Sequence, residues 1–487
     1  MNAITMPEWM AVHPYKKPRS ADYAYLKIAN RLHDCWRFSL AKDDFDDEVQ
    51  VIVSIVVAAY FEDVVSYTNL FGAFVRKHKE LYGKPLPFYN TNEGSYYEDE
   101  INKQDVLFLV WSTLEKESMG EFLNPENPRI VELASKMYEI LDKEFEKVPI
   151  NDYFLDYIQD TTHYKDFFAF KAMANWLCYE SYLMGIENTI LLAEQIENQE
   201  FDGITSIQQL EYAARSESLF SQKTGPLALP LTQWYAAMLE GMGMEKEIAT
   251  INAIENHASD YFKIDHIDET YLYIIDTYET AFAVLRSSFE NLSDEALQST
   301  VVITSLVKYN GEWNANGLSI WDNHEEIYEY LIEEKENVEQ ARKETYEKVL
   351  KANDGSPIAY FKNVIELKEW IARTLGADRE VDYSLVENKE DIVVFVSSDK
   401  EIEILPYIGC CIKDPKNPFF DADKAETKGI ALLVNHYSCP SDMYQYLCEN
   451  NMVPDIYINS FFGKEKGRKL VRDNSDFIAR FFKWNNY

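Results

Sequence analysis

Glycine is scarce in this chain, and this scarcity limits the possible folds more than any other feature. Only 17 of the 487 residues are glycine, roughly half of the usual share of about 7%. Tight turns and phosphate-binding loops need glycine at backbone conformations that other residues avoid. The sequence therefore favours a largely helical protein over a turn-rich β architecture, and its length suggests about two to four domains.

Acidic residues far outnumber basic ones. The chain has 83 Asp and Glu against 47 Lys and Arg, a formal net charge of -36. Disordered acidic segments lack aromatic residues, but aromatic residues make up 14% of this chain, so we expect the charge to lie on the surface of a packed protein. Such a surface repels nucleic-acid phosphates and attracts basic partners or cations. We therefore predict a protein partner, no nucleic acid and no cofactor.

No targeting or membrane segment is predicted. The first residues have neither a basic region nor an apolar region of the kind that signal peptides carry. The most apolar stretch, Val49 to Phe61, is well short of the roughly 20 residues that a membrane helix needs. The 6 cysteines include no C-x-x-C pair and are too sparse for a disulfide scaffold. We expect a soluble cytoplasmic protein, and its oligomeric state is left open.

Residues 1–255 are predicted to form a helical domain. The clearest helix follows Asn127-Pro128, where apolar residues recur at helical spacing from Ile130 to Phe145. The Val and Ile content of Glu48–Val65 suits a strand, but its length suits a helix that is buried on most sides, and we predict a helix. Further helices are predicted at 105–114, 164–184 and 206–221.

Residues 256–353 are predicted to form a mixed α/β segment. Tyr271–Ile275 and Val301–Val307 are β-rich runs. Asn310-Gly311, between apolar runs, is a strong signal for a β-hairpin because a type I′ turn needs positive φ at both central residues. The highly charged stretch Glu325–Ala352 predicts a long helix that bridges domains or lies on a surface.

Residues 358–487 are predicted to form a small α/β domain after the linker Asp354–Pro357. The chain as a whole is thus predicted to be mainly α, with an α+β C-terminal part. The helices predicted in this last domain are 360–375, 441–449 and 475–484, and its predicted strands are 392–396, 401–405, 430–434 and 455–458.

Acidic residues in the first third of the chain are the candidates for a binding site. They are Glu62, Asp63, Glu98 and Asp99, together with His78, and Glu100 and Asp105 lie close in sequence. Carboxylates that converge between helices bind Mg²⁺ or Mn²⁺ and support metal-assisted hydrolysis. Neither Glu-x-x-His nor H-E-x-x-H spacing is present, so we assign no metal and interpret these residues mainly as helix caps and solvated side chains.

Cysteines near the C-terminal end are a second candidate group. Cys410, Cys411, Cys439 and Cys448 could act as zinc ligands with His436, since thiolate and imidazole are suitable donors. Adjacent cysteines on a strand point to opposite faces, and free cysteine is commonly buried as a small apolar residue. We therefore favour a metal-free interpretation.

Several strings of residues resemble a known family. Examples are Trp9-Met10-Ala11-Val12-His13-Pro14-Tyr15, Ala59-Tyr60-Phe61-Glu62-Asp63 and Lys413-Asp414-Pro415. The chain is similar over nearly its whole length to an uncharacterised bacterial family, found mainly in gut anaerobes and known only as a domain of unknown function. The resemblance implies no catalytic residue, cofactor or partner.

These observations favour a cytoplasmic, non-enzymatic interaction or regulatory protein, and leave open whether the chain is an enzyme. The alternative is a metal-dependent hydrolase that uses the carboxylates between Glu62 and Asp105, which requires the candidate residues to meet in one pocket. A second alternative is an acidic inhibitor that mimics nucleic acid. It requires surface carboxylates at the paired spacing of DNA phosphates.

Overall fold

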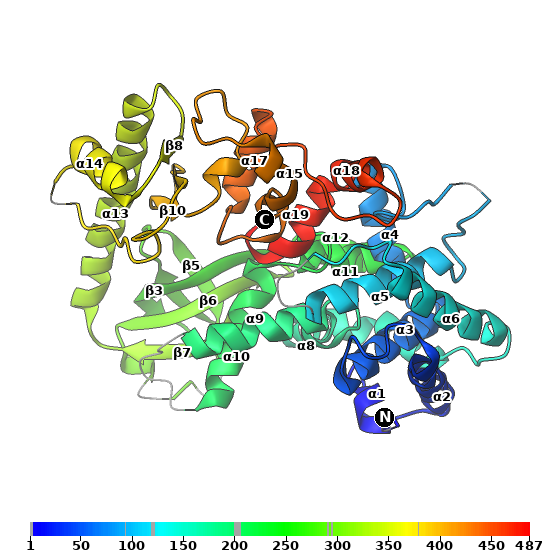
Figure 1. The fold of residues 1–487 in the computed structure, drawn as a ribbon. Coiled ribbons are helices and arrows are strands. Elements are labelled where there is room, and N and C mark those ends of the chain that lie inside the picture. The colour runs from blue at the N-terminus through cyan, green and yellow to red at the C-terminus, as the bar shows by residue number, and fades with distance from the viewer. Residues whose placement is uncertain are drawn as a thin grey trace. The chain divides into compact units, whose positions relative to one another are not determined.

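The computed structural model of the protein describes residues 3–92, 94–117, 122–198, 206–289, 292–293, 296–377 and 379–487. The chain divides into two units, Met1–Tyr328 and Glu329–Tyr487, and the division falls within the helix α13 (Glu325–Ala352). Helices predominate, and the strands lie in the middle and C-terminal parts of the chain (Figure 1). The predicted class, mainly α with α+β parts, is confirmed. The finer division into 1–255, 256–353 and 358–487 stays a prediction.

Unit 1 begins with helices that pack side by side (Figure 1). They are α1 (Met6–Met10), α2 (Ser20–Cys35), α3 (Asp47–Ser66), α4 (Leu70–Tyr82), α5 (Lys103–Glu117), α6 (Pro128–Glu144), α7 (Asp152–Gln159), α8 (Phe167–Asn175), α9 (Gly185–Asn198), α10 (Ile207–Ser221), α11 (Leu231–Glu240) and α12 (Glu245–Asn252). A short ribbon of β1 (Lys223–Thr224) and β2 (Leu229–Pro230) separates α10 from α11. α3 packs against α2 and α5, and α6 packs against the same two helices, so these four form the centre of the bundle.

The helix predicted at Glu48–Val65 is confirmed as α3, which extends it by one residue at each end. Asp46 caps its first turn by accepting a hydrogen bond from the Val49 backbone N–H at 3.0 Å. By length and composition α3 could cross a membrane, but 72% of its apolar window is buried inside the protein. A helix that is apolar on all sides is stable in water only when other elements surround it, and α3 meets that condition.

The last part of unit 1 is a closed five-stranded barrel with the order β3-β4-β5-β7-β6. Its strands are β3 (Glu255–Ile267), β4 (Tyr271–Ile275), β5 (Ala281–Leu285), β6 (Val301–Tyr309) and β7 (Glu312–Asp322). Neighbouring strands are antiparallel except β5 and β7, which are parallel. The long strand β3 pairs with both β4 and β6 and thereby closes the barrel. This is the order of the OB-type Greek-key barrel, in which the second and third strands form the usual ligand-binding face.

The hairpin predicted at Asn310-Gly311 is confirmed and joins β6 to β7. Both residues have positive φ, 51° and 85°, as a type I′ turn requires. Further along β7, Gly317 has a φ of 91° and lies against α10, where an added Cβ would be 2.9 Å from Ser216 Cβ. Asn316 Nδ2 donates to the Ser216 carbonyl at 2.7 Å. The barrel is therefore fixed to the helical bundle through α10.

Unit 2 contains a three-stranded antiparallel sheet with the order β10-β9-β8. The strands are β8 (Ile358–Phe361), β9 (Ile392–Phe395) and β10 (Glu403–Leu405), and the helices after α13 are α14 (Val364–Thr374), α15 (Ala422–Lys428), α16 (Ala431–Val434), α17 (Ser441–Glu449), α18 (Lys464–Arg472) and α19 (Ser475–Lys483). Residues of α13, α14 and the sheet share one apolar core that includes Val349, Trp370 and Val394. The predicted linker Asp354–Pro357 is the turn between α13 and β8.

Four of the predicted elements differ from the structure. The predicted strand Ile430–Val434 is wrong, because this run forms the single helical turn α16, which buries its leucines against α19. The predicted strand Asp455–Ile458 is neither helix nor strand. Tyr360 pairs with Val393 in the sheet, so the helix predicted at 360–375 begins only at Val364. The helix predicted at 164–184 is broken, because α8 continues as a π-helix that ends at Glu180.

Candidate functional site

A buried polar cluster joins the N-terminal segment to α3. Ligand-type atoms of His13, Asp22 and Glu62 all lie within 4.8 Å of one another, and none of the three side chains is more than 1% exposed. His13 Nε2 lies 2.7 Å from Glu62 Oε2, and its Nδ1 lies 3.0 Å from the Trp9 carbonyl. Each ring nitrogen thus faces an acceptor, which is the arrangement of a protonated imidazole.

Neutral donors complete this cluster. Asn151 Nδ2 donates to Glu62 Oε1 at 2.7 Å and to the Tyr15 hydroxyl at 2.8 Å. The Tyr15 hydroxyl in turn donates to Asp22 Oδ1 at 2.8 Å. Burial lowers the pKa of His13, but the charge and hydrogen bond of Glu62 and the charge of Asp22 outweigh it, so the pKa stands above its ordinary value of 6.5. The cluster is an internal ion pair held by hydrogen bonds.

The cavity beside His13 and Glu62 is small. Its volume is about 10 Å³, and apolar and aromatic side chains make up most of its lining. A volume of this size holds about one water molecule. A cavity of this size does not hold an organic substrate, and the hydrogen bonds of the buried pair tie the N-terminal segment to α3.

Asp63, the neighbour of Glu62, caps the next helix. Its Oδ1 accepts hydrogen bonds from the Thr68 hydroxyl and the Leu70 N–H at 2.7 and 3.0 Å. Its Oδ2 accepts from the Phe71 N–H and the Tyr182 hydroxyl, both at 2.7 Å. Leu70 and Phe71 are the first residues of α4, so a carboxylate of α3 supplies the acceptor that the start of α4 needs.

The remaining candidate residues do not join Glu62 and Asp63. His78 is buried, and its Nδ1 donates to the Lys84 carbonyl at 2.6 Å; burial lowers the pKa of His78 to about 4. Glu98 is 42% exposed and pairs with Lys79 Nζ at 2.6 Å, and Asp99 is exposed. Among the described residues, the groups of three that could hold a metal are His13–Asp22–Glu62 and His257–Asp260–Asp276. Of the five candidates, only Glu62 belongs to such a group.

Asp105 forms a separate buried cluster at the start of α5. Its Oδ2 accepts from the Tyr60 hydroxyl at 2.6 Å and from Asn102 Nδ2 at 3.1 Å. Burial raises the pKa of Asp105 to about 7 although these hydrogen bonds lower it. The carboxyl group therefore changes charge near neutral pH inside the protein.

Replacing Asp105 by asparagine should remove a pH dependence of stability. The native state keeps a proton that the unfolded state releases above pH 3.8, so stability is highest at low pH and is lost as pH rises towards about 7. The shift corresponds to at most about 4 kcal/mol. We expect the wild type to lose urea resistance relative to Asp105→Asn between pH 4 and 7, with Asp99→Asn as control. If the difference in urea resistance between the wild type and Asp105→Asn did not change with pH, this prediction would be contradicted.

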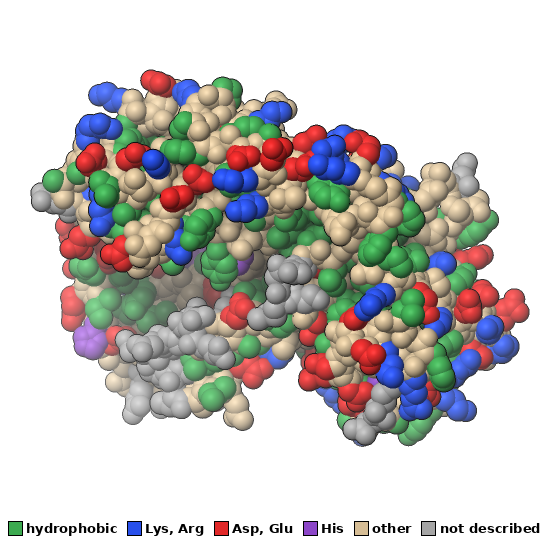
Figure 2. Space-filling view, viewed as in Figure 1, with side chains coloured by type: hydrophobic (Ala, Val, Ile, Leu, Met, Phe, Trp, Pro, Cys, Tyr) green, Lys and Arg blue, Asp and Glu red, His purple; other side chains and the backbone are tan. Residues whose placement is uncertain are grey.

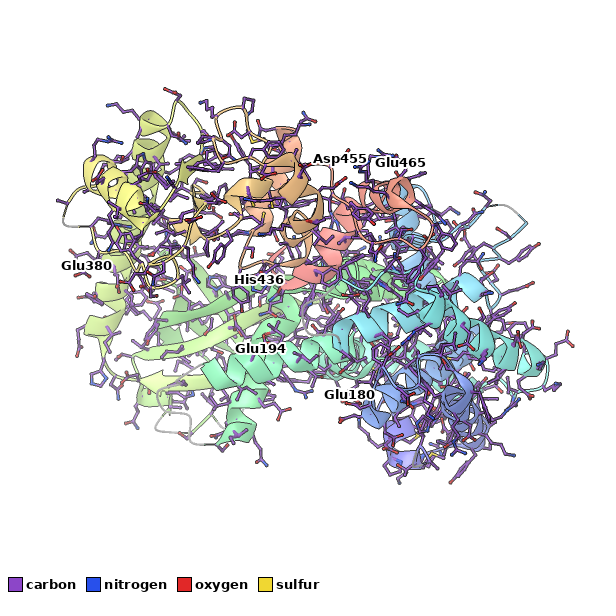
Figure 3. The ribbon with its side chains drawn as sticks, in the orientation of Figure 1. Glu180, Glu194, Glu380, His436, Asp455 and Glu465 are labelled. Carbon is purple, nitrogen blue, oxygen red and sulfur yellow. The ribbon has the colours of Figure 1, made fainter. Side chains whose placement is uncertain are left out.

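Of the four C-terminal cysteines, Cys410, Cys411 and Cys439 are buried and Cys448 is exposed. Cys410 and Cys411 lie on a 3₁₀ turn, with their sulfur atoms 3.7 Å apart. Burial raises the pKa of Cys411 and of Cys439 to about 12, so these thiols stay protonated in the metal-free protein. His436 lies against the Tyr437 ring, and Figure 3 shows it well away from Asp455 and Glu465. Neither group of possible metal ligands among the described residues includes a cysteine, and the metal-free interpretation stays a prediction.

The barrel contains the second group of possible metal ligands. His257 and Asp260 belong to β3, and Asp276 directly follows β4. His257 Nε2 lies 2.8 Å from Asp276 Oδ2. The sequence prediction missed this group because its members belong to different strands and fit no spacing motif.

The outer surface of the barrel carries a row of aromatic side chains flanked by carboxylates. His266 and Tyr273 are stacked, with ring centroids 4.0 Å apart and planes at 12°. The Tyr273 hydroxyl donates to Asp268 Oδ2 at 3.1 Å, and the Tyr271 hydroxyl donates to Glu312 Oε2 at 3.2 Å. We call these five residues the aromatic face. It lies on β3, the β3–β4 turn, β4 and β7, and it shares with the ligand-binding surface of OB-type barrels the second strand, β4.

Fold and sites together define a mainly helical protein that carries a small Greek-key barrel with an aromatic face. The chain belongs to the family DUF3843, proteins of unknown function, whose model matches residues 4–275 and 313–483. No curated protein and no solved structure is detectably similar to it. The matched ranges include the strings Trp9–Tyr15 and Ala59–Asp63, and the structure joins these two strings through His13 and Glu62.

Proposed function

We propose that this protein is a cytoplasmic, non-enzymatic interaction protein whose aromatic face binds a basic polypeptide segment. The observation that supports this most directly is the pairing of two half-buried tyrosine rings with two carboxylates on the outside of the barrel. A lysine or arginine side chain is attracted both to an aromatic ring, at about 6 Å or less from its centroid, and to a carboxylate, through charge-assisted hydrogen bonds.

The charge states of the aromatic face suit a cationic partner. Hydrogen bonds from the backbone N–H groups of Tyr271 and Thr270 lower the pKa of Asp268, so this carboxylate stays ionised. The hydrogen bond to Glu312 raises the pKa of Tyr271, and that to Asp268 raises the pKa of Tyr273. The rings therefore remain neutral while Asp268 keeps its negative charge.

Tyr273 is half-buried, with His266 stacked on one face of its ring. Ala283 of β5 is the partner of Tyr273 in the β4–β5 ladder, and a methyl group is too small to shield the ring. His266 is well exposed, with 59% of its side chain accessible. A guanidinium group can therefore approach the aromatic face from solvent.

The charge of the whole chain supports association with a basic partner. A net charge of -36 steers cationic molecules towards the protein and speeds their encounter. On the surface drawn in Figure 2, carboxylates are interspersed with Lys and Arg side chains. Long-range attraction thus comes from the whole surface, whereas specificity comes from the aromatic face. The six free cysteines fit the reducing conditions of the cytoplasm.

Fluorescence anisotropy with a labelled arginine–serine peptide tests this function. We expect binding that weakens with salt, and Tyr273→Ala should weaken it by about tenfold, the order expected for one cation–π contact beside a carboxylate. Tyr437→Ala is the matched control, since Tyr437 is 78% exposed but lies outside the barrel.

Two results would contradict the proposal. Equal losses in Tyr273→Ala and Tyr437→Ala, or no loss in either, would mean that net charge alone attracts the peptide. Binding of a neutral glucose oligosaccharide without binding of the peptide would instead make the aromatic face a carbohydrate site, since sugars also stack on aromatic rings.

A further inference from the structure

Three potential metal ligands converge where β3 begins. In a regular strand, residues three apart point to opposite faces of the sheet. A β-bulge lies between His257 and Asp260, where the pairing of β3 with β6 shifts register, and such a bulge redirects side chains. As a result, atoms of His257, Asp260 and Asp276 all lie within 4.8 Å of one another.

Bonds to other groups orient these ligands. His257 Nδ1 donates to the Ala258 carbonyl at 2.8 Å, and its Nε2 lies 2.8 Å from Asp276 Oδ2, so a proton or a metal ion lies between these two atoms. Asp276 Oδ1 accepts two backbone N–H groups of the β4–β5 turn at 2.8 and 2.9 Å, and Asp260 Oδ2 accepts the Thr277 hydroxyl at 2.6 Å. Histidines that bind metals are usually fixed in this way by a hydrogen bond from the second ring nitrogen.

This arrangement requires a cation. Two carboxylates and a lone pair that face one another repel, unless a proton or a metal ion lies between them. In the His13 cluster a proton meets the same requirement, because His13 is only 1% exposed and an ion has no route to it from solvent. His257 is 22% exposed, so an ion has a route from solvent to its Nε2.

We propose that His257, Asp260 and Asp276 bind one divalent transition-metal ion, either Mn²⁺ or Zn²⁺. One imidazole nitrogen favours metals such as zinc, whereas two carboxylates favour manganese and other hard ions. Three protein ligands leave at least one coordination position for water. The site is independent of peptide binding, because none of its ligands belongs to the aromatic face.

Electron paramagnetic resonance of Mn²⁺ tests the site in the full-length protein after treatment with a chelator. We expect one Mn²⁺ per chain, displaced by Zn²⁺, and an affinity reduced at least about tenfold in His257→Gln. Asp276→Asn, which keeps an acceptor for the β4–β5 turn, should give a similar loss. Circular dichroism shows whether each variant is folded.

His324→Gln is the matched control, because His324 also contacts an aspartate, Asp322 Oδ1, at 2.6 Å and belongs neither to this site nor to the aromatic face. It should bind Mn²⁺ as the wild type does. Equal affinity in the wild type and in both site variants would overturn the proposal, as would no binding at all, which would mean that a proton occupies the site. Binding lost in Glu98→Gln and retained in His257→Gln would instead favour the carboxylates between Glu62 and Asp105.

Discussion

Replacing Glu62 by alanine should destabilise the protein by about 3 to 5 kcal/mol, the usual loss when one partner of a buried ion pair is removed. The substitution leaves His13 without its nearest counter-charge in a site that is 1% exposed, and it removes the acceptor of Asn151 Nδ2. Urea denaturation followed by tryptophan fluorescence measures the loss. Glu98→Ala is the control, and we expect a change of less than about 0.5 kcal/mol because the side chain is a surface one.

The more conservative Glu62→Gln separates charge from packing. A glutamine amide can donate to a neutral His13 Nε2 while its oxygen still accepts from Asn151, so this variant should lose much less stability than Glu62→Ala. Its pH dependence should also change. The folded-state pKa of His13 lies above 6.5 in the wild type, so the stability it contributes is complete below pH 6.5 and is lost as pH rises through the folded-state pKa.

We therefore expect wild-type stability to fall relative to Glu62→Gln between pH 6 and 9. A loss below about 1 kcal/mol in Glu62→Ala, together with parallel pH profiles, would show that the pair is hydrated and carries little of the stability. That magnitude is typical of exposed ion pairs.

The helices could be predicted because their signals are local. The run at Glu48–Val65 is too long for a typical strand, and helix α3 follows. The charged stretch Glu325–Ala352 is the helix α13 with the same bounds, and Asn310-Gly311 forms the expected turn. In each case the decisive information lies within one contiguous segment.

Closure of the barrel could not be predicted, because it depends on contacts between distant segments. β3 has exposed and buried residues in irregular alternation, since bulges interrupt its pairing with both β4 and β6. An irregular pattern of this kind lacks the period of two by which strands are recognised. At Ile430–Val434 the sequence predicted a strand where a helical turn forms. A short apolar run alone does not distinguish a strand from a buried helical turn.

The candidate residues were chosen by closeness in sequence, which proved a poor guide to closeness in space. Glu98 and Asp99 are adjacent but exposed, whereas Glu62 meets His13 across 49 positions. One signal was available. Glu62 and Asp63 interrupt the apolar run of α3, and charged residues in a buried helix need partners. The identity of those partners depends on tertiary packing.

Replacing Asp63 by alanine should also destabilise the protein by about 3 to 5 kcal/mol. Four donors lose their acceptor: two hydroxyl groups and the backbone N–H groups of Leu70 and Phe71. A buried donor without a partner costs about 1 to 3 kcal/mol, and water entering the space left by the carboxylate offsets part of the total. Asp99→Ala removes the same side chain from an exposed position and should change stability by less than about 0.5 kcal/mol.

Asp63→Asn should be almost as harmful as Asp63→Ala. The NH₂ group of asparagine would replace one of the two carboxylate oxygens, each of which now accepts two hydrogen bonds, and it would then face two donors. Hydrogen exchange locates the effect. The amide protons at the start of α4 should exchange much faster in both variants, while those in the middle of α6 should change only with global stability. If Asp63→Asn melts like the wild type and exchange at Leu70 and Phe71 is unchanged, then Asp63 does not cap α4, and its conspicuous place beside Glu62 needs another explanation.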